Sequence, residues 1–168
     1  SSNVMVADAH NNVIYMNEAA HAMFSAAQDD IRREISGFDA GCIVGANIDM
    51  FHRQPAHQRQ ILDRLNGTHR AGFEIGGRTM RFVANPVVDG DGERLGTVVE
   101  WTDRTAEVAV EHEIDAIVEA AGNGDLTRRI AVQGKEGFFL QLANGINALI
   151  GRMEGAFTDI AQVMEAMS

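Results

Sequence analysis

From Phe139 to Met167, apolar residues recur at alternating intervals of three and four, and this repeat restricts the possible folds more than any other feature. Its members are Phe139, Leu142, Ile146, Leu149, Met153, Ala156, Ile160, Val163 and Met167. So narrow a stripe is typical of a coiled coil, because the seam is buried against a partner helix. A symmetric dimer is the simplest source of that partner. The alternative is a helix that packs on its own domain.

A shorter heptad segment precedes this repeat. Its apolar positions are spaced 4-3-4 and are Val110, Ile114, Ile117 and Ala121. They predict a helix that begins near Ala106 and ends at the turn 122–124, where two glycines flank an asparagine. A polar connector with two apolar anchors, Leu126 and Ile130, then leads to a second helix that starts near Lys135.

The first 105 residues instead show the alternation of apolar and polar residues that is typical of strands. The predicted strands are Asn3–Asp8, Val13–Asn17, Arg70–Ile75, Arg78–Val87 and Leu95–Trp101. Gly76-Gly77 is a two-residue hairpin signal, and Asp89-Gly90-Asp91-Gly92 is a second turn.

Helices are predicted between the second and third strands. Asn17 is expected to cap a helix that ends at about Phe24, and a separate charged helix is expected over Gln28–Ile35. Pro55 favours the start of a further helix over Ala56–Leu65. This order of elements predicts an α+β fold, a five-stranded antiparallel sheet with helices on one face, around an apolar space that suits a small ligand.

The two patterns meet in Thr97–Thr105, TVVEWTDRT. The strand part carries the only tryptophan of the chain, Trp101. Asp103 and Thr105 follow directly and are good residues for the N-terminus of a helix, because their oxygens accept first-turn N–H groups. A change on the strand is therefore expected to pass directly to the helix.

Composition excludes several classes of protein. The net charge is −10 and the 14 basic residues are scattered, which argues against a nucleic-acid partner. The single cysteine, Cys42, excludes an internal disulfide framework and fits a reducing cytoplasm. No apolar run reaches the roughly 20 residues of a membrane span, so we expect no membrane segment in this fragment. Both ends are expected to be cuts through a longer protein.

These residues resemble two families of signalling domain. Residues 1–105 resemble a PAS sensor domain in NVMVAD, in VIYMN followed by a helix, and in the three-strand end GFEIGGRTMRFVANPVVDGDGERLGTVVEW. Asp103 to Thr105 has the Asp-x-Thr form of the signal-transfer motif at the PAS boundary. Residues 106–155 are similar to a HAMP domain in their two heptad helices and in the motifs GDLTRRI and KEGFF. Residues 156–168 then begin a continuing coiled-coil helix.

PAS followed by HAMP, with FHRQPAHQR inside the PAS domain, resembles bacterial methyl-accepting chemotaxis receptors of the soluble aerotaxis type. The resemblance implies a cytoplasmic homodimer that is joined through its C-terminal helices. Its implied partners are a downstream chemoreceptor signalling domain with its kinase and adaptor. The implied function is to sense O2 or another diatomic gas and to relay that signal through Asp103 and Thr105 to the HAMP helices.

The same resemblance implies b-type haem. It places His52 as the proximal ligand of the iron, His57 as a second histidine of the motif, and Trp101 as the donor to bound O2. Neutral imidazole is a good iron ligand, and an indole N–H donates but cannot accept. Which of the two histidines binds iron stays open. The expected pocket residues are Ile48, Met50, Phe51, Ile61, Leu65, Phe73, Phe82, Val83 and Val99.

Other interpretations remain beside a haem sensor. A PAS domain without haem would bind an organic ligand or nothing and would serve dimerisation and relay. In that case His52 is a loop residue and Trp101 a core or dimer-surface aromatic. A fragment of a kinase or cyclase is the third, but no catalytic motif is present, so we expect no enzyme. Asp89 begins an imitation of a calcium loop, which we reject because Arg94 stands where glycine is needed.

Overall fold

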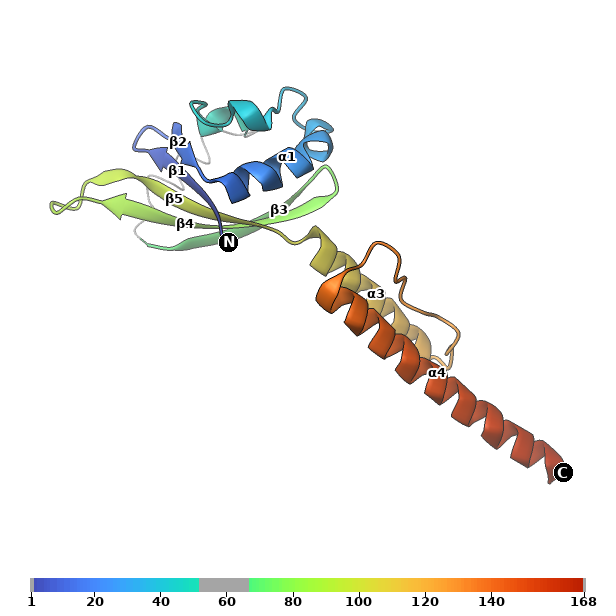
Figure 1. Cartoon of the computed structure of the whole chain (residues 1–168). Helices are drawn as coiled ribbons and strands as arrows, with labels where there is room; N and C mark the ends of the chain where they lie inside the picture. Colours follow the sequence, from blue (N-terminus) through green and yellow to red (C-terminus); the bar gives the residue numbers. More distant parts are fainter. Residues whose placement is uncertain (1, 52–66, 168) are drawn as a thin grey trace. The chain divides into compact units, whose positions relative to one another are not determined.

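The computed structural model describes residues 2–51 and 67–167. The chain divides into two units, Ser1–Thr105 and Ala106–Ser168 (Figure 1). The predicted helix over Ala56–Leu65 lies outside the described residues, and so do His52 and His57.

The strands of the first unit form one antiparallel sheet in the order β2-β1-β5-β4-β3. They are β1 Asn3–Asp8, β2 Val13–Met16, β3 His69–Ile75, β4 Arg78–Val88 and β5 Arg94–Asp103. The predicted strands are confirmed, with ends displaced by at most two residues. The last strand, β5, lies in the centre, where Trp101 pairs with Asn3 of β1 on one side and with Phe82 of β4 on the other.

The predicted hairpin turn between β3 and β4 is also confirmed. Gly76 and Gly77 have φ angles of 59° and 84°. A two-residue hairpin loop of the favoured twist needs positive φ at both positions, which glycine adopts without steric cost.

Helix α1, Glu18–Arg32, covers one face of the sheet (Figure 1). The predicted cap is confirmed, since Asn17 Oδ1 accepts a hydrogen bond from the amide of Ala20 at 2.9 Å. The predicted break at Phe24, with a separate helix over Gln28–Ile35, is wrong. The buried residues of α1 continue past that point at helical spacing, as Ala27 and Ile31, so the apolar stripe that faces the core is unbroken.

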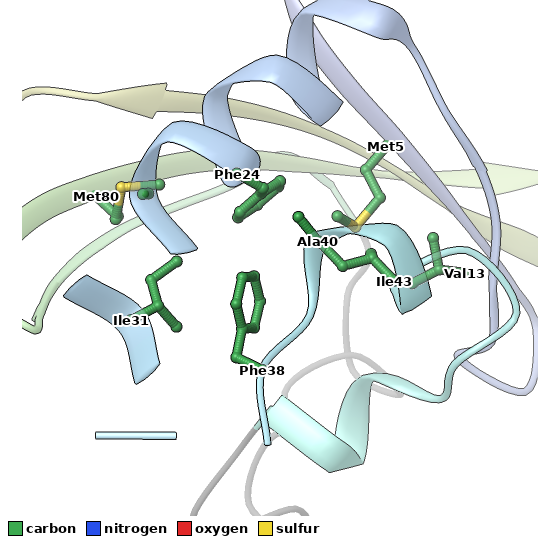
Figure 2. Packing of buried hydrophobic residues seen from close by; sticks show 9 residues of the cluster. Met5, Val13, Phe24, Ile31, Phe38, Ala40, Ile43 and Met80 are labelled. Carbon is green, nitrogen blue, oxygen red and sulfur yellow. The ribbon is translucent and has the colours of Figure 1, made fainter. Parts of the chain in front are cut away.

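The core of this unit lies between α1 and the sheet, and two short 3-10 helices, η1 Ala40–Cys42 and η2 Ile48–Phe51, complete it. Figure 2 shows Phe24 and Phe38 near the middle of the cluster, and their ring centroids are 6.2 Å apart. The buried members are Met5, Val13, Phe24, Ala27, Ile31, Phe38, Ala40, Ile43 and Met80.

The second unit consists of α3 Thr105–Gly122, an extended connector, and α4 Gly137–Ala166. Ile130 of the connector is only 2% exposed, and its backbone is held by one side chain of α4. The amide of Ile130 donates to Asn147 Oδ1 at 2.8 Å, and Asn147 Nδ2 donates to the Ile130 carbonyl at 3.0 Å. Both predicted anchors of the connector, Leu126 and Ile130, pack in the apolar cluster of this unit. Among the described residues, no helix has the length and apolar character that crossing a bilayer requires.

Helix α4 has two apolar sides. Inside the unit it buries Ala143 and Ile150, which are outside the three-and-four repeat, and the partly buried Ile146 of the repeat packs against the same cluster. The later large members of the repeat are 40–83% exposed in the single chain. We call these residues the apolar stripe, and they are Leu149, Met153, Ile160, Val163 and Met167.

Candidate functional site

An apolar cavity lies between the inner face of the sheet and the helical segments of the first unit. It has an inner part of about 100 Å³, and a wider part of about 480 Å³ adjoins it. The residues that line both parts are Met5, Ile35, Ile48, Phe51, Phe73, Ile75 and Trp101. These shared residues are apolar or aromatic, which suits a small molecule with a large apolar surface.

Trp101 brings the one indole N–H of the chain to this cavity. Three rings hold the indole in place, with centroid distances of 5.3 Å to Phe24, 6.2 Å to Phe73 and 5.3 Å to Phe82. Its Nε1 is buried and finds no acceptor among the described residues. A buried N–H that makes no hydrogen bond is unfavourable, so the arrangement is well suited to a ligand that presents an acceptor to Trp101.

Most of the predicted lining residues that the structure describes do reach the cavity. They are Ile48, Phe51, Phe73, Phe82 and Val99. Two predictions are wrong. Met50 is 70% exposed, and Val83 lines a hollow on the opposite face of the sheet, because side chains alternate along β4 and Phe82 already points inward. Leu65 and Ile61 lie outside the described residues.

The predicted lining contains none of the polar residues on the wall of the wider part, which are Asn11, Glu34, His69, Glu74 and Thr97. His69 of β3 lines the wider part, and its ring centroid lies 5.8 Å from that of Phe82. The signal was present in the strand period, because His69 is in phase with Phe73 and Ile75, which also face the cavity.

The end of β5 is fixed by a second cluster of polar groups. Asp103 Oδ1 accepts hydrogen bonds from the amide and the hydroxyl of Thr105, the first residue of α3. Asp103 Oδ2 accepts from Arg78 Nη1 at 2.7 Å. The backbone of the neighbouring Thr79 takes part in two further hydrogen bonds. Its amide donates to Thr105 Oγ1 at 3.1 Å, and its carbonyl accepts from the Arg104 amide at 2.8 Å. We call Asp103, Arg104 and Thr105 the junction.

The junction also sets the ionisation of Asp103. Burial alone raises the pKa of this carboxyl, but the hydrogen bonds from Thr105 and the guanidinium of Arg78 outweigh burial and hold the pKa below its ordinary value. A carboxyl whose pKa is lower in the folded state stabilises the fold above its unfolded pKa. That stability is lost as the pH falls through the folded value.

Asp103→Asn is therefore expected to lower the free energy of unfolding by about 1 kcal/mol at pH 7, and the difference from the unmodified protein should shrink below about pH 4. Urea unfolding at pH 7 and pH 3 measures both values. Asp125→Asn is the matched control, because Asp125 and Thr127 repeat the same two hydrogen bonds at an exposed position. A difference for Asp103→Asn that is equal at both pH values would contradict the assignment.

Comparison with known proteins shows what this arrangement is similar to. The chain matches no protein-family model. All of its 168 residues align, at 44% identity, with the methyl-accepting chemotaxis protein McpB of Pseudomonas aeruginosa, of which the chain spans 25%. A solved structure of the Aer2 receptor from Vibrio cholerae, described as a dual PAS-heme oxygen sensor, is 29% identical with a TM-score of 0.55. That likeness covers 61% of this chain and 94% of the other.

The first unit therefore has the PAS fold that the sequence predicted, a five-stranded antiparallel sheet with helices on one face. All 168 residues of the chain also resemble a part of a methyl-accepting chemotaxis protein, which amounts to 25% of that protein. The HAMP-like character of the second unit stays a prediction.

Proposed function

We propose that this chain is the signal-transducing sensor module of a chemoreceptor, with a ligand site beside Trp101. The observation that carries the proposal is the buried indole Nε1, which has no acceptor among the described residues. Trp101 and Asp103 are two residues apart on β5, so they lie on the same face of the strand. A ligand that shifts the indole thereby acts on the strand that ends in the junction.

Haem b is the ligand that we propose. The apolar and aromatic residues of the cavity would suit the faces of this group, and the buried N–H of Trp101, which has no acceptor among the described residues, would supply a hydrogen-bond donor beside it. His52 would hold the iron, with His57 as the second histidine of the motif, and haem would supply the metal that binds a diatomic gas. The likeness to a receptor described as a PAS-heme oxygen sensor supports this choice.

The output would run from β5 through Asp103 and Thr105 into α3. In this proposal the helices shift between two packing states. A ligand changes the populations of these states only if it binds one more tightly than the other, so contacts that differ between the states matter most. We propose residues 106–155 as a HAMP-like dimeric segment and residues 156–168 as the start of a continuing coiled coil. A cytoplasmic receptor with a signalling domain, a kinase and an adaptor downstream completes the proposal, which the likeness to McpB supports.

A PAS domain that binds an organic ligand or none is the second candidate. The observation in its favour is the inner part of the cavity, about 100 Å³ lined by apolar and aromatic side chains, which suits a small organic molecule as well as it suits the edge of haem.

An absorption spectrum of the purified protein after haem loading tests the haem proposal. A Soret band is expected, and His52→Ala should abolish it, whereas His10→Ala, at an exposed turn, should not. Trp101→Phe should keep the band and weaken O2 binding by about tenfold, because one hydrogen bond to the ligand is lost. Absence of the band in the unmodified protein would end the haem proposal and leave the second candidate. A His57→Ala spectrum decides between the two histidines.

A further inference from the structure

We propose that Asp30 is a positioning residue that ties α1 to the junction, so that α1 provides a second route from the cavity to α3. This inference rests on the proposed function, in which the ligand contacts Trp101. The direct route runs along β5. The second would run from Trp101 to Phe24, along α1 to Asp30, and through Arg78 to Asp103.

Arg78 is the residue that joins the two elements. Its Nε donates to Asp30 Oδ2 at 2.6 Å, its Nη2 donates to the carbonyl of Ala26 at 3.0 Å, and its Nη1 donates to Asp103 Oδ2 at 2.7 Å. The side chains of Arg78, Asp30 and Asp103 are only 19–26% exposed, so water screens their attraction less than it screens a surface pair. One guanidinium thus fixes two carboxylates, one on α1 and one at the end of β5.

The same helix touches the indole. Phe24 of α1 is 6% exposed, and its ring meets Trp101 edge to face at a centroid distance of 5.3 Å. Because a packed core transmits displacement, a shift of the indole that moves Phe24 also moves the helix that carries Asp30. Trp101 of the cavity is therefore connected to both carboxylates that Arg78 binds. It reaches Asp30 through α1 and Asp103 along β5.

The C-terminal end of α1 is in direct contact with the hairpin turn between β3 and β4. The hairpin turn lies directly on the helix backbone, because a Cβ at Gly76 would run into the carbonyl oxygen of Asp30. The Gly76 amide also donates to Glu34 Oε1 at 2.8 Å. The start of β4 and the end of α1 are therefore expected to move together, and Arg78 moves with both.

The test compares Asp30→Asn with Asp29→Asn in the ligand-free chain. Asp29 is the matched control, since its side chain is 95% exposed and its ion pair with Arg32 spans 3.8 Å. Hydrogen exchange of the Thr105 amide reports on the junction. The indole N–H resonance of Trp101, the only tryptophan, reports on the cavity.

Asp30→Asn should speed exchange at Thr105 by about tenfold relative to Met5 in the sheet, and it should shift the indole resonance. Asp29→Asn should change neither, and Asp30→Glu should restore both in part. Phe24→Leu is the second variant. If Asp30→Asn does not fold, Phe24→Leu provides the test instead, because it should speed exchange at Thr105 in the same way. Unchanged exchange and an unchanged indole signal in a folded variant would overturn the route.

The outcome is independent of haem. A chain that never shows a Soret band can still show the coupling between Asp30 and Thr105, and then only the ligand proposal fails. A chain that binds haem but shows no coupling keeps its ligand site and loses the route through α1.

Discussion

Gly76→Ala is expected to lower the free energy of unfolding of the first unit by about 3 kcal/mol or more, from two costs that add. The φ angle of 59° is unfavourable for alanine, and the new methyl group would collide with the carbonyl oxygen of Asp30, a backbone atom of α1. Neither the hairpin nor the helix can yield without weakening the contact between them. Urea unfolding followed by the fluorescence of Trp101 measures the change.

The adjacent glycine provides the control for this substitution. Gly77 has a φ angle of 84°, but no atom lies within 4 Å of a Cβ built there. Gly77→Ala should therefore show the backbone cost alone, about 1–2 kcal/mol. Equal losses for the two variants would mean that the close approach of the hairpin to α1 contributes nothing to stability.

Lysine at both Ile160 and Val163 is expected to abolish self-association of the chain through α4. These residues are 56% and 58% exposed in the single chain and belong to the apolar stripe. The other side of α4 is already used inside the unit, since Ala143 and Ile150 are buried there. The stripe is therefore free to pack against the same stripe of a second copy, and two charges in that seam should weaken the dimer by at least about 100-fold.

Sedimentation velocity over a range of concentrations measures this effect. Gln162→Lys adds a charge on the same helix at a position outside the three-and-four repeat, and this control should leave the dimer intact. An unmodified chain that stays monomeric, or a control that dissociates as readily as the stripe variant, would contradict a dimer through this seam.

The sheet could be predicted from the sequence because strand alternation is a local property. Asn3–Asp8 was predicted to the residue, and Asn17 was recognised as a cap from its side-chain chemistry alone. The length of α1 could not be predicted in the same way. After Phe24 most residues are polar, and only the folded structure shows that Ala27 and Ile31 continue the buried face. The heptad repeat of α4 likewise does not reveal that Ala143 and Ile150 are the residues that pack inside the unit.

The candidate site was predicted in part. Trp101 and Asp103 stand out by residue type and by their place between two patterns. Arg78 did not stand out, because its role depends on Asp30, 48 residues away in the chain, which only the folded sheet and helix bring within reach. Apolar character alone predicts both Phe82 and Val83 as cavity residues, but they are neighbours on β4, and strand alternation places only Phe82 in the cavity.

A single residue, Arg104, separates the last strand from α3. A one-residue spacer is too short to form a loop of its own. Each residue of an α-helix advances the chain by about 100° around the helix axis. The residue at which β5 ends therefore also decides the residue at which α3 begins. A different sensor joined to α3 would have to keep this one-residue spacing, whereas the molecule that it binds could differ.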